Sequence, residues 1–326
     1  MQKISILGSG RWASFHAWYQ MEKLHHDVTM WGRAEDPNFI QLMKEKKNGY
    51  IELPKTLRYS TDLQATLNFS EIIIVAISAQ GMQEFSQKIG ACNPQHKTFV
   101  LCMKGIDQNT GERLSQILRK NIADSNQICV WVGPGHIEEL TAGQPNVMLM
   151  AGDNQSVISR MIKMFESPLI TFLGSDDLVG VEVGAAAKNV MGIVAGFLDG
   201  LGKSSLKGAL MARGCYEVSL LIEKMGGKRM TAFGMSHLGD FEATLFNQNS
   251  HNRRYGEKFI QNHSLENIGT AEGVGTAKAL YLLSRKYGVI MPISNTVYSV
   301  LYLNSDKNNV IHDLFESKTH REFDYE

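Results

Sequence analysis

Seven short apolar runs, separated by polar stretches of helical character, constrain the fold of this chain more than any other feature. All seven precede residue 178: KISILG, VTMWGR, EIIIVAIS, TFVLCMKG, ICVWVG, NVMLMAG and ITFLGS. Strands that read as continuous apolar runs are typical of a parallel sheet whose two faces are both covered by helices. The pattern therefore predicts a doubly wound α/β domain over residues 1–177.

The strand signals stop after Asp177, and long helical segments separated by glycine-rich turns follow. The amphipathic spacing i, i+3, i+4, i+7 is present at Val218, Leu221, Ile222 and Met225. Gly226 and Gly227 then provide a stop signal for that helix. We therefore predict a second, all-helical domain over residues 178–326. No proline-rich linker separates the halves, so we expect a tight domain interface with the ligand site in its cleft.

Charge and cysteine content narrow the classes of ligand. The chain has 33 Lys plus Arg and 33 Asp plus Glu. This balance creates no overall field that would attract nucleic acid or an anionic membrane, so an anionic ligand must be held by local groups. The four cysteines are widely spaced and form neither a CxxC pair nor a metal-binding pattern with histidine. We expect reduced thiols and no metal site.

The sequence predicts neither export nor membrane insertion. Residues 1–3 lead directly into the first apolar run and its glycine turn, which leaves no room for a signal peptide. The stretch that most resembles a membrane span, residues 184–202, is interrupted by Lys188 and Asp199 and is rich in glycine. It predicts a buried helix in a cytoplasmic protein without stable membrane insertion.

A GxGxxA turn follows the first apolar run directly, in the order Gly8-Ser9-Gly10-Arg11-Trp12-Ala13. Gly8 permits a tight turn, Gly10 lets a pyrophosphate approach the backbone, and Ala13 allows close packing of helix on strand. The helix that follows presents the positive end of its dipole to the anion. A strand, this turn and a helix at the N-terminus favour dinucleotide binding over a purely structural turn.

The end of the second run bears on the choice between NAD and NADP. An NAD-selective site usually offers a carboxylate to the ribose 2′-hydroxyl, whereas Arg33 in Trp31-Gly32-Arg33 can accept a 2′-phosphate. Two alternatives stay open, because Glu35 or Asp36 can still reach the ribose and Arg33 can be an ordinary solvated residue. The cofactor is thus NAD or NADP, with a slight preference for NADP competence.

Two polar groups of residues are conspicuous in the second half. Lys188 and Asn189 interrupt an otherwise apolar helix, where a lysine either extends its ammonium to water or exchanges protons readily in low-polarity surroundings. Farther along, Asp240 and Thr244 precede a cationic, amide-rich cluster of Asn249, Ser250, His251, Asn252, Arg253 and Arg254. On its chemistry alone, this cluster is either an anion site or a solvated loop.

These segments resemble the bacterial-type NAD(P)-dependent glycerol-3-phosphate dehydrogenase family over nearly the whole chain. Besides the glycine turn, the matching segments are CMKGID, VGPGHIEEL, VEVGAAAKNVMGIVAGFLDGLG, KGALMARG, LGDFEAT, SHNRRYG, AEGVGTAKAL and VIMPISNTVYSVLY. Each is unspecific by itself, but their order and spacing together are specific. The resemblance implies an N-terminal Rossmann domain, a helical domain related to that of 6-phosphogluconate dehydrogenase, and a homodimer.

The resemblance also implies an activity, the interconversion of sn-glycerol 3-phosphate and dihydroxyacetone phosphate with NAD or NADP. It assigns Lys188 as the catalytic general acid/base, Asp240 as its paired carboxylate and Lys104 as a second lysine at the reacting oxygen. The residues implied for the small phosphorylated substrate are Lys104, Asn189, Thr244, His251, Asn252 and Arg253. With the glycine turn and Arg33 included, the expected cofactor-binding set is Gly8, Ser9, Gly10, Arg11, Trp12, Arg33, Lys104 and Glu272.

The chain departs from the family pattern along the expected cleft. Ala13 replaces the last glycine of the turn, Ile77-Ser78 replaces a Val-Pro pair, and residues 132–137 replace an SGPSFA-like segment. His251 occupies the position of the arginine that grips the substrate phosphate, and a neutral imidazole cannot reproduce that charged fork. Two alternatives therefore remain: a related dehydrogenase for a different phosphorylated or carboxylated hydroxy compound, and a non-catalytic dinucleotide-binding sensor.

Overall fold

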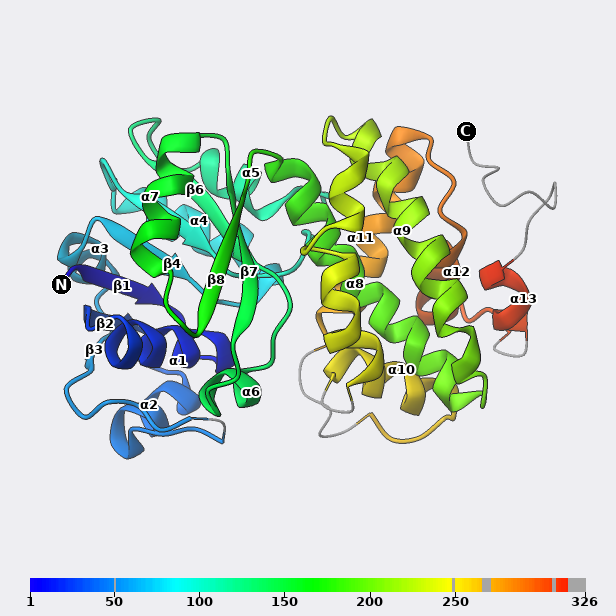
Figure 1. Ribbon diagram of the computed structural model, residues 1–326, viewed down its shortest axis with the longest axis horizontal. Coiled ribbons are helices and arrows are strands. Elements are labelled where there is room, and N and C mark those ends of the chain that lie inside the picture. Colours follow the sequence, from blue (N-terminus) through cyan, green and yellow to red (C-terminus); the bar gives the residue numbers. More distant parts are fainter. Residues whose placement is uncertain (50, 248–249, 266–270, 307–308, 316–326) are drawn as a thin grey trace. The chain divides into compact units, whose positions relative to one another are not determined.

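The computed structural model describes residues 1–49, 51–247, 250–265, 271–306 and 309–315, and it divides into two compact units (Figure 1). The first unit comprises Met1–Met103 and Leu114–Leu178, and the second comprises Lys104–Arg113 and Val179–Glu326. Each unit has its own cluster of buried apolar side chains. The first is an α/β unit, and the described part of the second is built from helices.

The described residues of the first unit form an eight-stranded sheet in the order β3-β2-β1-β4-β5-β6-β7-β8 (Figure 1). The strands are β1 (Lys3–Leu7), β2 (Asp27–Trp31), β3 (Arg58–Ser60), β4 (Ile72–Val75), β5 (Thr98–Leu101), β6 (Gln127–Val132), β7 (Asn146–Gly152) and β8 (Ile170–Ser175). All seven predicted runs form strands. The eighth strand, β3, was not predicted, because three residues of mixed polarity give no readable alternation.

The strand order determines where the glycine turn lies. β1 pairs in parallel with β2 on one side and β4 on the other, so that Ile6 lies opposite both Met30 and Ile74. The order of strands along the chain reverses at this point. Ligands of such sheets bind at the carboxyl ends of the strands beside the reversal. Because the glycine turn follows β1 directly, it lies at the edge where a dinucleotide is expected.

A wholly parallel sheet was the wrong expectation on one side of the molecule. β7 runs antiparallel to β6, with Trp131 opposite Met150, and β8 is parallel to β7. A buried strand carries apolar side chains whether it is parallel or antiparallel to its neighbours. The composition of NVMLMAG therefore identifies a strand without revealing its direction.

Helices cover both faces of the sheet, as a doubly wound fold requires. They are α1 (Arg11–Trp18), α2 (Pro37–Glu45), α3 (Leu63–Phe69), α4 (Met82–Ala91), α5 (Leu114–Arg119), α6 (Ile137–Thr141) and α7 (Gln155–Phe165). Ile4 and Ile6 point to one face, where they share a core with residues of α1, α2, α6 and α7. Ser5 points to the other face and donates its hydroxyl hydrogen to the carbonyl of Thr66 in α3 at 2.6 Å.

The second unit contains six α-helices within its described residues (Figure 1). They are α8 (Leu178–Gly200), α9 (Lys207–Lys224), α10 (His251–Ile260), α11 (Glu272–Tyr287), α12 (Pro292–Tyr302) and α13 (Val310–Phe315). Two short turns precede α10: a 3-10 turn at Leu238–Asp240 and a π-turn at Glu242–Phe246. The predicted helix around Val218 is α9, which ends at Lys224 just before the two predicted stop glycines.

Helix α8 is the central helix of this unit. Within the described ranges it alone is long and apolar enough to cross a membrane, but 94% of its most apolar 18-residue window is buried inside the protein. Glycines of α8 and α10 allow close packing: a Cβ at Gly196 of α8 would lie 2.1 Å from the carbonyl oxygen of Arg253, and one at Gly256 of α10 would lie 2.1 Å from that of Ile193. The backbones of α8 and α10 are therefore in contact, which brings the start of α10 beside the middle of α8.

The segment 104–113 groups with the helices, which corrects the simple division at residue 177. Asn189 of α8 donates its amide hydrogen to the carbonyl of Lys104 at 2.8 Å, and Arg113 forms an ion pair with Glu182 of α8. Lys278 of α11 also donates to the side-chain oxygen of Asn109 at 3.0 Å. This excursion between β5 and α5 cannot be read from the sequence, because its helical partners lie at least 69 positions away.

Candidate active site

Two lysines and one carboxylate meet inside the helical unit. The Nζ of Lys104 lies 2.6 Å from Oδ2 of Asp240, and the Nζ of Lys188 lies 3.3 Å from the same oxygen. Lys188 also donates to the hydroxyl of Thr244 at 2.8 Å. The Asp240 side chain is only 2% exposed, so the carboxylate that the two lysines share is shielded from solvent. The structure thus brings together all three residues predicted to be catalytic, with Thr244 beside them.

The electrostatic environment makes Lys188 a group that titrates near neutrality. Burial disfavours its charged form and lowers its pKa to about 8, and the positive charge of Lys104 acts in the same direction. The charge of Asp240 and its hydrogen bond oppose this effect. A lysine with such a pKa can both donate and accept a proton at physiological pH, as acid/base catalysis requires.

Local structure explains how these side chains converge. Lys188 projects from the middle of α8, whereas Lys104 lies just beyond β5 at the start of the segment anchored on α8. Asp240 ends the 3-10 turn, and Thr244 lies in the π-turn that follows. At Gly192, a Cβ would lie 2.7 Å from a methyl carbon of Thr244, so the glycine lets this turn approach α8. Three separate stretches of chain therefore build one polar site.

A chain of side-chain amides runs beside the lysines. Gly273 donates its backbone N–H to Oδ1 of Asn252 at 2.9 Å, and Asn252 donates to Oδ1 of Asn189 at 3.0 Å. Asn189 in turn donates to the carbonyl of Lys104 at 2.8 Å. These bonds fix the orientation of both amides and join the starts of α10 and α11 to the backbone of Lys104. Glu272, expected to bind the cofactor, is the first residue of α11 next to Gly273.

The structure separates the members of the cationic cluster. His251 begins α10 and is partly exposed, and the hydroxyl of Ser250 caps the helix by accepting from the N–H of Arg253. The guanidinium of Arg253 pairs with Asp199, which also binds Lys207. Asp199 follows Lys188 by 11 positions along α8, or about 16 Å at 1.5 Å per residue. The structure therefore does not bring Arg253 to the lysine pair. Asn249 lies outside the described residues.

The glycine turn of the first unit has the geometry of a dinucleotide cradle. Gly8 has φ +128°, and a Cβ there would lie 2.3 Å from the carbonyl oxygen of Ala76. At Gly10, by contrast, a Cβ would meet nothing within 4 Å. Gly10 is also the N-cap of α1 and has no side chain with which to cap that helix. Open space at a helix N-terminus fits a pyrophosphate.

The remaining predicted cofactor residues of the first unit differ in their surroundings. Ser9 donates its hydroxyl hydrogen to Asp36 at 3.1 Å, and the same carboxylate caps α2. The guanidinium of Arg11 pairs with Glu138, whereas Trp12 packs edge-on against Phe15 with ring centroids 5.4 Å apart. Arg33 is exposed and lies just beyond the end of β2.

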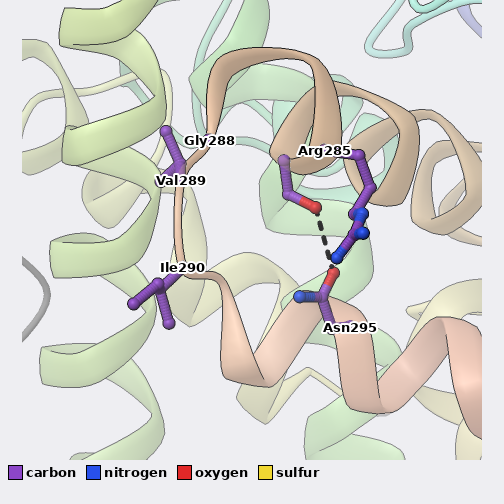
Figure 2. Close-up of a pocket in the computed structure, with 6 residues that line it drawn as sticks. Arg285, Gly288, Val289, Ile290 and Asn295 are labelled. Carbon is purple, nitrogen blue, oxygen red and sulfur yellow. Dashed lines mark hydrogen bonds between the residues drawn. The ribbon is translucent and has the colours of Figure 1, made fainter.

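An open hollow on the helical unit is a separate feature. It is lined by Ser284, Arg285, Gly288, Val289, Ile290 and Asn295, between the end of α11 and the start of α12 (Figure 2). Inside it, the Ser284 hydroxyl donates to Oδ1 of Asn295 at 3.3 Å. None of these residues belongs to the lysine site or to the amide chain. The hollow offers no paired acid and base for proton transfer.

Comparison with known families accounts for nearly the whole chain. Residues 3–158 match the family model described as the N-terminus of NAD-dependent glycerol-3-phosphate dehydrogenase, and residues 177–312 match the model of its C-terminus. The glycerol-3-phosphate dehydrogenase (NAD(P)+) of Prosthecochloris aestuarii is 32% identical over 324 residues, which cover 95% of this chain and 97% of that protein. The corresponding protein of Lysinibacillus sphaericus is 32% identical over 334 residues, which cover 99% of each chain.

A solved structure provides an independent comparison of the fold. Glycerol-3-phosphate dehydrogenase from Coxiella burnetii superposes on this chain with a TM-score of 0.90 and 24% sequence identity. The match covers 97% of this chain and 99% of that one. The predicted fold class, a Rossmann-like sheet followed by a helical domain, is thereby confirmed.

Proposed function

The chain belongs to the NAD-dependent glycerol-3-phosphate dehydrogenase family, and from this premise we propose that it interconverts sn-glycerol 3-phosphate and dihydroxyacetone phosphate with NAD or NADP. The observation that carries the proposal is the cluster of Lys104 and Lys188 around the buried carboxylate of Asp240. It combines a lysine that titrates near neutrality with a fixed counter-charge and a second cation. Reduction of a ketone needs such a set, because a proton must reach the oxygen as negative charge develops on it.

The chemistry follows from the roles of these side chains. When bound, a reduced nicotinamide would supply the hydride that the carbonyl carbon of the substrate accepts. Lys188 donates a proton from Nζ to the carbonyl oxygen and becomes neutral, which its lowered pKa favours. Asp240 and Thr244 hold the lysine's Nζ in place, and Lys104 adds positive potential at the developing oxyanion. In the reverse direction, neutral Lys188 removes the hydroxyl proton.

For the substrate phosphate, we propose the N-terminus of α10. His251 and Asn252 lie in its first turn, at the positive end of the helix dipole, which favours an anion. The side chain of Asn252 is hydrogen-bonded to Asn189 and to the backbone of Gly273. It therefore fixes the positions of these neighbours and also lines the proposed phosphate site. Arg253 is paired with Asp199. We therefore propose that the next residue, Arg254, supplies the positive charge that assists His251. This arrangement supports a phosphorylated substrate held less tightly than by a guanidinium fork.

The proposal is tested by following NADH and NADPH oxidation with a panel of ketones. We expect turnover with dihydroxyacetone phosphate, and little with unphosphorylated dihydroxyacetone or with 2-keto acids. The replacement of the phosphate-gripping arginine by His251 makes a related dehydrogenase the alternative worth testing. Turnover of another keto phosphate or a keto acid, with none of dihydroxyacetone phosphate, would reject the substrate while retaining the reaction class.

Substitutions in the glycine turn should separate folding from cofactor binding. Gly8→Ala is expected to destabilise the fold by about 1 to 3 kcal/mol, because its φ of +128° is strained for alanine and its Cβ meets Ala76. Gly10→Ala should leave stability within about 0.5 kcal/mol. It should nevertheless weaken NADH binding about tenfold or more, since its methyl group fills the space a pyrophosphate needs. Thermal unfolding and fluorescence titration with NADH measure the two effects. Wild-type NADH affinity in Gly10→Ala would contradict the assignment.

Arg33 is proposed to read the ribose 2′-phosphate. Arg33→Ala should weaken NADPH binding by about 1.5 to 3 kcal/mol and NADH binding much less, because only NADPH offers a charged partner there. Titration of both cofactors measures the difference. Lys44→Ala, which removes an exposed cation from α2, is the matched control for a general change in charge. Equal losses for the two cofactors would mean that Arg33 does not contact the 2′-phosphate.

The cellular setting forms part of the proposal. All four cysteines are free and three are buried, which is consistent with a reducing compartment and supports a cytoplasmic location. We propose a homodimer without stable membrane insertion that supplies glycerol 3-phosphate for glycerophospholipid biosynthesis. Sedimentation of the purified protein tests the dimer directly.

A further inference from the structure

His237 is the N-cap residue of the turn that carries Asp240. It is fully buried and immediately precedes the 3-10 turn Leu238–Asp240. Its own carbonyl accepts the N–H of Asp240 at 3.1 Å. The position of the Asp240 main chain therefore depends directly on where the His237 backbone is held.

The side chain of His237 connects this turn to the helix of Lys188. Its Nδ1 lies 2.9 Å from the carbonyl oxygen of Gly184 in α8. In an α-helix this carbonyl is the one that accepts the backbone N–H of Lys188, four residues later. The same atom thus bonds the turn of Asp240 and the backbone of Lys188.

Two further features keep the imidazole close to α8. Gly184 allows the approach, because a Cβ there would lie 3.1 Å from Cβ of His237 and 3.0 Å from Oγ of Ser236. On the other side, the ring of Phe241 packs edge-on against the imidazole with centroids 4.6 Å apart. The imidazole is therefore fixed between α8 and the residue that follows Asp240.

The imidazole is neutral in this setting. A carbonyl can only accept, so Nδ1 carries the hydrogen and donates it to Gly184. Burial lowers the pKa of His237 to about 4, although the carbonyls of Gly184 and Gly214 and the charge of Asp240 oppose this effect. The charge of Lys188 lowers the pKa further. A neutral ring does not compete with the two lysines for the Asp240 carboxylate.

We propose that His237 is a positioning residue that holds Asp240 against Lys188 through its bond to the Gly184 carbonyl. It touches no reacting atom, and its kinetic consequences rest on the proposed function. A histidine in a short irregular turn gives no periodic signal, so the sequence alone does not predict this role. Its link to Gly184 spans 53 positions and becomes visible only in the folded chain.

Paired substitutions test the hydrogen bond against simple packing. His237→Phe keeps a ring but lacks the donor, and we expect kcat for ketone reduction to fall about tenfold, the loss of one positioning bond. KM for NADH should not change. His237→Asn places an amide N–H where Nδ1 stood and should restore kcat to within about twofold of wild type. Ser236→Ala, which removes a buried hydroxyl without a described partner from the same turn, should leave kcat unchanged.

The pH profile adds a readout that a purely structural role would not change. Reduction needs protonated Lys188, so kcat falls as pH rises through its pKa. In His237→Phe, Asp240 supports the ammonium less well, and the alkaline limb should move to lower pH. Wild-type kcat and pH profile in the Phe variant would overturn the proposal. Equal losses in the Phe and Asn variants would also overturn it, because packing alone would then explain the effect.

Two measurements do not depend on the reaction. Nitrogen-15 NMR of the wild type should show His237 as the Nδ1–H tautomer, and the Nε2–H tautomer would refute the bond to Gly184 even if the Phe variant fails to fold. Carbon-13 NMR of lysine Cε, assigned through Lys188→Met, should show a lower pKa for Lys188 in His237→Phe. If the wild type reduced no ketone, these results would still decide the positioning role, so its failure is distinguishable from failure of the proposed function.

Discussion

Lys188→Met is expected to reduce kcat for ketone reduction by about 10³-fold, since it removes the proton donor while keeping an unbranched side chain of similar length. The pKa of about 8 supports this role, because the group is charged enough at neutral pH to donate and neutral enough at higher pH to accept. Steady-state kinetics at saturating NADH and substrate measure the loss. The matched control is Lys224→Met, which changes an exposed lysine at the end of α9.

The Lys188 variant should remain folded and bind its cofactor. Burial lowers the pKa of Lys188, so its charged form opposes folding at neutral pH, and methionine does not carry this cost. Fluorescence titration with NADH should therefore give wild-type affinity, since the glycine turn belongs to the other unit. A variant that retains wild-type kcat would remove Lys188 from the mechanism. A variant that loses NADH binding would show that the lysine acts on the cofactor.

Asp240→Asn should lower kcat by about 10²-fold, because Lys104 and Lys188 lose the buried carboxylate that they share while the shape of the side chain is kept. Without this counter-charge, the pKa of Lys188 should fall further, and the alkaline limb of the reduction profile should move to lower pH. Kinetics over a range of pH measure both effects. Asp153→Asn, at an exposed position of the first unit, controls for loss of one negative charge.

The outcome for KM decides how Asp240 acts. A fall in kcat with little change in KM is expected if the carboxylate orients and charges Lys188. A rise in KM with unchanged kcat would instead make Asp240 a substrate-binding residue and would contradict its assignment as the partner of Lys188.

Much of the fold could be predicted because its signals are local. Seven apolar runs became strands, and α8 could be predicted from its composition alone. What escaped prediction depends on contacts between distant positions. The reversed direction of β7 leaves no trace in an apolar run, and the segment 104–113 joins the helices through partners in α8 and α11.

The candidate site was predictable to a different degree. The family resemblance predicted catalytic roles for Lys104, Lys188 and Asp240. The structure brings these side chains within hydrogen-bond or ion-pair distance. The cationic cluster was ambiguous because neighbouring residues of a helix point about 100° apart, and Arg253 turns to Asp199. The proposed role of His237 could not be predicted from the sequence, because only the folded chain brings its side chain into contact with the helix of Lys188.

If hydride passes from the nicotinamide to dihydroxyacetone phosphate while Lys188 supplies the proton, a deuterium label must follow the hydride. The protein is incubated with dihydroxyacetone phosphate and NADH that carries deuterium at both positions of nicotinamide C4, and the product is examined by mass spectrometry and NMR. We predict deuterium at C2 of sn-glycerol 3-phosphate with the wild type, and about 10³-fold slower formation of the same labelled product with Lys188→Met. Unlabelled product or the absence of glycerol 3-phosphate would contradict hydride transfer to this ketone, and an unchanged rate in Lys188→Met would contradict proton donation by Lys188.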